Sequence, residues 1–212
     1  MIFYKNERKQ VAQLMRRLYK QKLTSSSGGN VSMRTEDGKI LLTSSQKDKS
    51  KLKWQDVAVI DSDGTLLTPD IKPSMEINIH KKIYIQRPDV FAIVHAHPIY
   101  ATTYAVSTSK INTNLTGESR FILGEITYIE YCLMGTEELA DKCATGLKSS
   151  NIAIMKNHGA LCLGKNLFEA FDRMEVLEYV AQMNFNLEVI KNSKPLPQNE
   201  VKKIDKLKNH YN

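Results

Sequence analysis

The sequence predicts an α/β domain with a mixed sheet, and three observations support this fold class. Apolar stretches of strand length, such as VFAIVHAH at residues 90–97, alternate with longer stretches whose apolar residues recur at helical spacing. Short β-rich segments lie near the Asp63-Gly64 pair, which is typical of a hairpin turn between antiparallel strands. Because hairpins alternate with helices along the chain, the predicted sheet cannot be purely parallel.

The N-terminal half is predicted to contain two helices and three short strands. Apolar residues recur between charged ones at helical spacing over residues 5–22, which indicates an amphipathic helix that covers a sheet. Strands are expected near residues 30–34, 39–44 and 56–60. A second helix is expected to begin after Pro73, with Ser74 as its N-cap, and to end near Gln86.

The C-terminal half is predicted to contain further buried strands and two helices. By composition, strands are expected at residues 90–97, 126–131 and 152–156. Gly135-Thr136 opens one helix, and a long helix is expected over about residues 167–191. Pro195 and Pro197 then separate a short polar segment. We therefore expect one domain over residues 1–195 and a C-terminal tail over residues 196–212.

The distribution of charge argues against a nucleic-acid-binding protein. The net charge is +7, but residues 1–22 contribute +6 and residues 191–212 contribute +4, so the middle of the chain carries −3. A phosphate-tracking groove needs basic residues interleaved with aromatic ones on the folded domain. The slightly acidic middle of the chain does not provide them, and we expect no nucleic-acid partner.

The cysteines and the apolar stretches indicate a reduced protein outside the membrane. Cys132, Cys143 and Cys162 are odd in number and have no C-x-x-C spacing, so neither a disulfide framework nor a thiolate zinc site is expected. No stretch approaches the roughly 18 apolar residues that a membrane span needs. The expected location is the cytoplasm.

Three histidines have the spacing of metal ligands. His95 and His97 are two residues apart on a predicted strand, so both imidazoles face the same side. His158 follows the end of another predicted strand, and strand ends are where α/β sites open. Three neutral imidazoles with a free fourth position are typical of catalytic zinc. Glu76, expected in the first turn of its helix, can serve as the acid/base partner or merely favour the helix dipole.

Two loops rich in hydrogen-bond donors indicate an anion site. Residues 25–30 read SSSGGN, and glycine allows backbone N–H groups to approach an anion closely. Residues 43–47 read TSSQK, followed by further lysines up to residue 53, which are also compatible with a solvated face. Ser74 at a helix start would add a third contact. Such loops can hold a phosphate group, although a bare Ser/Gly turn is the commoner explanation of the first one.

Five strings of the sequence resemble the class II aldolase/adducin family. They are, in order, GGNVSMR, LLTSSQK, KPSMEINIH, IVHAHP and KNHGALCLG, the last followed by the long helix. The resemblance covers about residues 5–190 and implies a three-layer α/β/α subunit with a central, largely antiparallel mixed sheet. It also implies a zinc-dependent aldolase that cleaves a ketose 1-phosphate, of the L-fuculose 1-phosphate kind, to dihydroxyacetone phosphate and an aldehyde. The family usually forms fourfold-symmetric tetramers, so the resemblance implies a homotetramer.

The resemblance also assigns roles to particular residues. It implies that His95, His97 and His158 hold the zinc ion, or another divalent ion, and that Glu76 is the catalytic carboxylate. Tyr211 falls where these aldolases place a C-terminal tyrosine that reaches the site of a neighbouring subunit. The positions that match the family's phosphate site are Gly29, Asn30, Ser45, Gln46, Ser74 and Met75.

The sequence departs from the family pattern at three places, which leaves other functions open. Gln46 replaces a glycine, Met75 replaces a serine or alanine, and residues 111–124 contain no tyrosine to match the aldolases' other active-site tyrosine. The lysine-bearing loop SSQKDKSKL resembles that of a methylthioribulose-1-phosphate dehydratase. A ribulose-5-phosphate 4-epimerase typically carries aspartate in place of Glu76, and an adducin-like interaction module lacks the metal ligands.

Overall fold

One mixed sheet of seven strands forms the centre of the described chain. A computed structural model of the protein describes residues 4–211, without the side chains of Asn209 and Tyr211. The strand order is β3-β2-β1-β4-β7-β6-β5, and of these neighbours β5 and β6 pair in parallel while the others pair antiparallel. The strands are Asn30–Arg34 (β1), Ile40–Thr43 (β2), Val57–Ile60 (β3), Ala92–Ala96 (β4), Thr127–Ile129 (β5), Ile152–Met155 (β6) and Gly159–Gly164 (β7).

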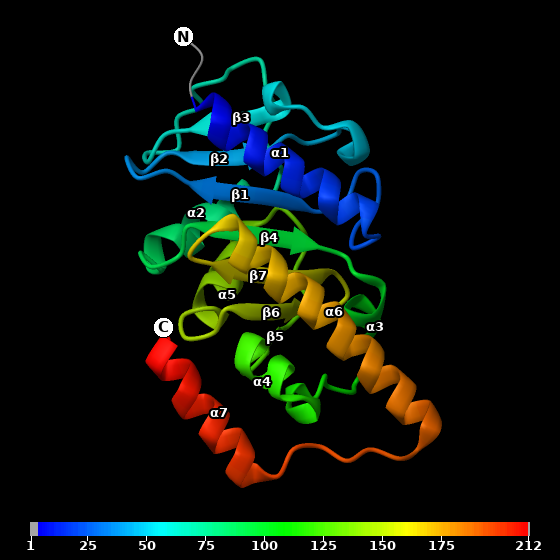
Figure 1. Cartoon of the computed structure of the whole chain (residues 1–212). Coiled ribbons are helices and arrows are strands. Elements are labelled where there is room, and N and C mark those ends of the chain that lie inside the picture. The colour runs from blue at the N-terminus through cyan, green and yellow to red at the C-terminus, as the bar shows by residue number, and fades with distance from the viewer. Residues whose placement is uncertain (1–3, 212) are drawn as a thin grey trace.

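Helices cover both faces of this sheet, which makes the three-layer α/β/α fold that the sequence predicts. The α-helices are Lys5–Lys20 (α1), Ile77–Gln86 (α2), Ile99–Ala105 (α3), Gly117–Leu123 (α4), Glu137–Gly146 (α5), Leu167–Ile190 (α6) and Gln198–Tyr211 (α7). Short 3-10 helices span Lys49–Lys51 (η1), Trp54–Asp56 (η2) and Thr113–Leu115 (η3). Helices α1 and α6 lie in front of the sheet and α2 and α5 behind it (Figure 1).

Two hydrophobic cores follow from the alternation of side chains along the strands. Val94 of β4 belongs to the core under α1 and α6, together with Leu177. Its neighbour Ile93 belongs to the core under α2 and α5, together with Ile83. Because successive strand residues face opposite sides, the apolar central strands bury both of their faces. None of the helices in residues 4–211 combines the length and apolar character that crossing a bilayer requires.

The start of α2 differs from the expectation. The helix begins at Ile77 with Glu76 as its N-cap, so Ser74 lies outside it. Residues 72–74 instead pair with the end of β2: the Ser74 N–H donates to the Thr43 carbonyl at 3.2 Å. Because of this extended pairing the helix begins later than expected, and the Glu76 side chain lies before the first turn and makes no capping hydrogen bond there.

The C-terminal segment, which the sequence indicates as a tail, forms a helix that is docked on the domain. Helix α7 packs beside α4, and its residue Val201 is buried against the rest of the protein. The guanidinium of Arg120 on α4 donates to both carboxylate oxygens of Asp205, at 2.7 and 2.8 Å. A bidentate pair of this kind fixes the direction of a helix as well as its position.

Candidate active site

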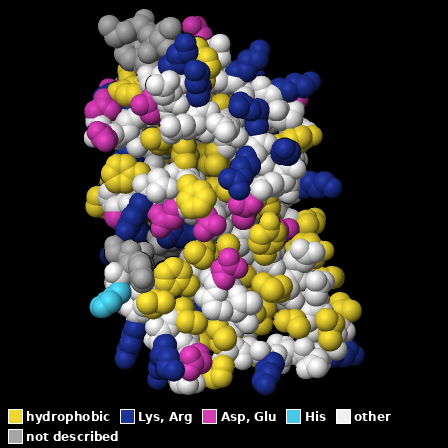
Figure 2. Space-filling view, in the orientation of Figure 1, with side chains coloured by type: hydrophobic (Ala, Val, Ile, Leu, Met, Phe, Trp, Pro, Cys, Tyr) yellow, Lys and Arg dark blue, Asp and Glu magenta, His cyan; other side chains and the backbone are white. Residues whose placement is uncertain are grey.

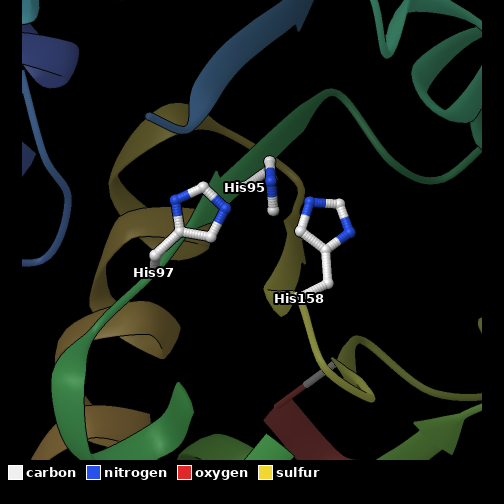
Figure 3. Close-up of side chains that lie close together, drawn as sticks. All are labelled: His95, His97 and His158. Atoms are coloured by element: carbon white, nitrogen blue, oxygen red, sulfur yellow. The ribbon is translucent and has the colours of Figure 1, made fainter. Parts of the chain in front are cut away.

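The pairing of three strands brings the three histidines together. His95 lies in β4 and His97 just beyond its end, both on the face covered by α2. His158 lies in the tight turn between β6 and β7, where Asn157 adopts a left-handed conformation with φ of 55°. Because β7 pairs antiparallel with β4, with Ala160 opposite Ala96, the turn lies beside the end of β4. The three rings come together there (Figure 3).

The geometry of the three imidazoles fits a divalent metal ion. One ring nitrogen from each lies within 4.8 Å of the others. The Nδ1 of His95 donates to the Ala160 carbonyl at 2.9 Å, which leaves its Nε2 directed toward the other two rings. Burial lowers the pKa of His95, and it lowers the pKa of His97 to about 3, which favours the neutral form that binds a cation. His95 is buried and the other two are half-buried, which leaves one side of the cluster accessible.

Glu76 places a buried carboxylate against this cluster. Its Oε2 lies 3.2 Å from Nε2 of His95, and its Oε1 lies 3.2 Å from Nε2 of His158. Burial alone would raise the pKa of Glu76, but His95, His158 and the Asn30 amide outweigh it and hold that pKa well below its usual range. Within residues 4–211, Oε1 has no hydrogen-bond donor. An ionised oxygen facing imidazole lone pairs is the environment that a cation stabilises.

Two glycines allow the chain to pack closely around the histidines. Gly29 has φ of +66°, and a Cβ there would lie 2.7 Å from the His95 carbonyl oxygen. At Gly159 a Cβ would lie 2.5 Å from Cδ2 of His97. Both distances are too short for any larger residue. Gly29, singled out in the sequence for an anion loop, therefore also sets the distance between that loop and the metal-binding strand.

Hydrogen bonds join the three segments that carry the predicted phosphate residues. The Lys49 N–H donates to Ser26, linking residues 44–49 to residues 26–30. The Ser45 N–H donates to Lys72 at 3.0 Å, and the Asn30 amide donates to the Ser74 hydroxyl at 3.1 Å. The structure thus brings Gly29, Asn30, Ser45, Gln46, Ser74 and Met75 onto adjoining segments. Their binding of phosphate stays a prediction.

The departures at Gln46 and Met75 have different structural consequences. Gln46 has φ of 56°, in the left-handed region that glycine adopts readily, so the loop backbone keeps a glycine-like course at a cost of about 1–3 kcal/mol. The Met75 side chain is exposed and contributes no hydrogen bond donor. At Met75 only the backbone N–H group is suited to an anion, whereas Gln46 offers its side-chain amide as well.

The lysines of the loop are not simply a solvated face. Lys49 is buried, its Nζ donates to the Ser44 carbonyl at 2.6 Å, and burial lowers its pKa to about 8. Lys47 pairs with Asp56, with 3.5 Å between nitrogen and oxygen. The Lys49 side chain stabilises the loop through its bond to Ser44 and is not exposed to solvent. The interpretation of these lysines as a solvated face is therefore wrong at Lys49.

Sequence reasoning missed a group of buried polar residues next to Glu76. The Asn30 amide donates to Oε2 of Glu76 at 2.8 Å, and its Oδ1 lies 2.5 Å from Nε2 of His80. On the other side of the ring, Nδ1 of His80 lies 2.7 Å from the Ser32 hydroxyl, which lies 2.7 Å from the Tyr84 hydroxyl. The spacing of Glu76, His80 and Tyr84 at four-residue intervals was the available signal.

Tyr211 lies far from this cluster within its own chain. The C-terminal end of α7 is on the opposite side of the molecule from the end of β4 that carries the histidines (Figure 1). The side chain of Tyr211 lies outside the described part of the structure. Its participation in the site of a neighbouring subunit stays a prediction.

Comparisons with known proteins agree with this arrangement. The Class II Aldolase and Adducin N-terminal domain matches residues 9–185. The L-fuculose phosphate aldolase of Methanocaldococcus jannaschii is 38% identical over 177 residues, which cover 84% of this chain and 94% of that protein. The 3-oxo-tetronate 4-phosphate decarboxylase of Haemophilus influenzae is 29% identical over 84% of this chain and 86% of its own length. A solved L-fuculose 1-phosphate aldolase superposes with a TM-score of 0.87 at 28% identity, over 95% of each chain.

The protein therefore belongs to the class II aldolase and adducin family. With its three clustered histidines, it falls among the metal-dependent aldolases of that family.

Removing one imidazole should abolish metal binding. We expect about one divalent ion per chain in the native protein and a large loss in His97→Ala, because three nitrogen ligands are the least that holds such an ion firmly. Elemental analysis after dialysis measures the content. His210→Ala, an exposed histidine on α7, is the matched control and should keep its ion. Unchanged metal content in His97→Ala would contradict the site.

A methyl group at Gly29 should disturb the site, whereas one at Gly38 should not. Both glycines have positive φ, but a Cβ at Gly38 meets no atom within 4 Å. Gly29→Ala should therefore lower the free energy of unfolding by about 1–3 kcal/mol more than Gly38→Ala, and should weaken metal binding. Denaturant unfolding and metal titration measure both effects. Equal losses in the two variants would mean that the close approach to His95 is unimportant.

Proposed function

We propose that the protein is a zinc-dependent aldolase that cleaves a ketose 1-phosphate, such as L-fuculose 1-phosphate, to dihydroxyacetone phosphate and an aldehyde. The observation that carries the proposal is the buried Glu76 carboxylate, 3.2 Å from two members of a three-histidine cluster. The relationship to an L-fuculose phosphate aldolase supports the phosphorylated sugar as substrate.

The proposed metal ligands are His95, His97 and His158. Neutral imidazoles are the usual ligands of catalytic zinc, and the half-buried His97 and His158 leave room for substrate oxygens. Breaking a carbon–carbon bond beside a carbonyl leaves negative charge on oxygen, and a bound divalent ion supplies Lewis-acid stabilisation of that charge.

Glu76 is the proposed proton carrier. A carboxylate held ionised by its neighbours accepts a proton at neutral pH and returns it to carbon. Burial limits the contact of the carboxylate with bulk water, which favours proton transfer to and from the substrate. The Asn30 amide donates to Oε2, which leaves Oε1 as the oxygen free to act.

The adjoining segments around Gly29, Ser45 and Ser74 are the proposed phosphate site. Backbone N–H groups of loops with positive φ bind anions well, and Gly29 and Gln46 both have such φ values. A phosphate held there would leave the other end of a short sugar near the metal-binding histidines. The proposed phosphate positions are Gly29, Asn30, Ser45, Gln46, Ser74 and Met75. The amide hydrogens of Asn30 already bond to Ser74 and Glu76, whereas Ser45, Gln46 and Ser74 each carry a side-chain donor.

A homotetramer is the proposed assembly, and the cytoplasm the proposed location. Exposed apolar side chains gather along the C-terminal half of α6 (Figure 2), where the residues include Tyr179, Phe185, Val189 and Ile190. Apolar surface of this kind is typical of contacts between subunits. The three cysteines are free and buried, and burial raises the pKa of Cys143 and of Cys162 to about 12, which suits a reduced protein.

Product analysis tests the reaction. Metal-loaded protein is given a panel of ketose 1-phosphates, and release of dihydroxyacetone phosphate, loss of water and release of carbon dioxide are scored separately. Dihydroxyacetone phosphate alone supports the proposal. Water loss would favour the dehydratase that the lysine-bearing loop resembles, and carbon dioxide from a 3-oxo acid phosphate would favour a decarboxylase.

Glu76→Gln should slow turnover without removing the metal. Glutamine keeps the shape of the side chain but cannot carry the proton, so kcat should fall by roughly 10²–10⁴ while metal content and fold are retained. Steady-state kinetics, elemental analysis and circular dichroism measure the three properties. Near-native turnover would remove Glu76 from the mechanism, and loss of the metal would make it a ligand instead.

Tyr211→Phe should impair cleavage but spare proton exchange. Cleavage needs a proton donor at the distant oxygen of the substrate, whereas exchange between solvent and dihydroxyacetone phosphate needs only the groups around Glu76. The two rates are measured by product release and by isotope incorporation. Parallel loss of both would indicate general damage, and no loss in either would exclude Tyr211 from the site.

A further inference from the structure

We propose that His80 is a positioning residue for Glu76, and that the chain of buried side chains from Tyr84 through Ser32 and His80 to Asn30 holds the catalytic carboxylate in one orientation. The inference rests on the proposed role of Glu76. It assigns a task to a histidine that is separate from the three of the metal cluster.

The chain of hydrogen bonds forms because side chains on strand β1 and helix α2 repeat at nearly the same spacing. Asn30 and Ser32 are two residues apart on β1 and face α2, a separation of about 6.8 Å along a strand. Glu76, His80 and Tyr84 are spaced by four residues at the start of and along α2, or about 6 Å per step. Because the two repeats nearly coincide, the side chains from the strand insert between those from the helix. The order in space is Glu76, Asn30, His80, Ser32 and Tyr84.

Chemistry fixes the direction of every bond in the chain. A carboxylate only accepts, so the NH2 group of Asn30 must face Glu76, and its carbonyl oxygen Oδ1 must face His80. An amide oxygen also only accepts, so the ring nitrogen Nε2 of His80 carries the proton. The other nitrogen, Nδ1, then accepts from the Ser32 hydroxyl, which itself accepts from Tyr84. All donors point toward Glu76, an arrangement in which each bond strengthens the next.

Burial keeps this arrangement in a single state. His80 is completely buried, and the loss of solvation lowers its pKa to about 3, so the ring is neutral at any pH where the protein works. A neutral ring with a donor on one side and an acceptor on the other has one tautomer that satisfies both neighbours. Asn30 and Ser32 are buried as well, so water does not compete for these bonds.

The consequence for Glu76 follows from the amide of Asn30. Without a donor at His80, the Oδ1 of Asn30 loses its partner, and only the bonds of the NH2 group to Glu76 and Ser74 still orient the amide. A less firmly oriented amide holds the Glu76 carboxylate less firmly in its position beside His95 and His158. The proposed metal ligands are other groups, and the Asn30 amide hydrogens bond to Glu76 and Ser74, so the loss should appear mainly in kcat and much less in KM.

The test compares substitutions that keep or remove the donor. His80→Leu removes it, and His80→Gln keeps an N–H near the position of Nε2. Ser32→Ala is a gentler change that lets the ring adopt the other tautomer. Ile83→Ala is the control, because it removes buried volume from the same helix without touching the chain of hydrogen bonds.

We expect His80→Leu to lower kcat about 10–100-fold, with KM and metal content changed less than about threefold. His80→Gln should recover most of the loss, Ser32→Ala should lie between them, and Ile83→Ala should lower the melting temperature without a matching loss of kcat. A loss that follows melting temperature across all four variants, or a glutamine variant as slow as the leucine variant, would overturn the proposal.

An NMR experiment tests the proposal without measuring activity and without a bound metal. In metal-free native protein, nitrogen-15 NMR of the imidazoles should show His80 with its proton on Nε2 from pH 5 to pH 9. The Asn30 amide protons should give two separate signals that persist in His80→Gln and merge or exchange rapidly in His80→Leu. A proton on Nδ1, or Asn30 signals unchanged in His80→Leu, would refute the positioning role even if the substrate class proves different.

Discussion

The antiparallel pairing of β4 with β1 on one side and β7 on the other is the constraint on which the site depends. It sets Asn30 opposite His95 and Ala160 opposite Ala96, so residues distant in sequence meet at one end of one strand. A one-residue slip would turn His95 and His97 to the face under α1 and α6. Gly29 and Gly159, next to these histidines, also favour this register, because they allow the neighbouring segments to pack closely against β4.

Much of the fold could be predicted because long periodic segments dominate it. Helices α1 and α6 and strands β1, β4 and β6 lie where their apolar patterns indicate, and the mixed, largely antiparallel sheet is confirmed. The sequence does not predict strand β7, nor the short helices α3 and α4, since seven residues show too few turns for a helical pattern. Helix α7 lies in the segment that the sequence indicates as a tail, because its polar sequence carries little apolar signal and the docking that stabilises it comes from Arg120 across the chain.

Part of the candidate site could likewise be predicted from the sequence, and part could not. Spacing on a strand predicts that His95 and His97 face one point, and its position after a strand end adds His158. The resemblance to a family then assigns roles to these histidines and to Glu76. What spacing could not reveal is how Asn30 is used, because its partners lie on α2, about fifty residues away in sequence. The burial of Lys49 was hidden for a related reason: its neighbours in sequence are charged, while its Nζ reaches back to the carbonyl of Ser44.

The clamp between Arg120 and Asp205 also bears on the proposal that Tyr211 reaches the site of a neighbouring subunit. Asp205 is six residues before Tyr211 in a continuous helix, so the end of α7 lies within about 9 Å of a fixed point. A flexible linker would spread that residue through a large volume and lower its effective concentration at any one place. A docked helix restricts the position of Tyr211. In the proposed oligomer, the conformational entropy of ordering the end of α7 is therefore lost once, when the subunit folds, and not again at each catalytic turnover.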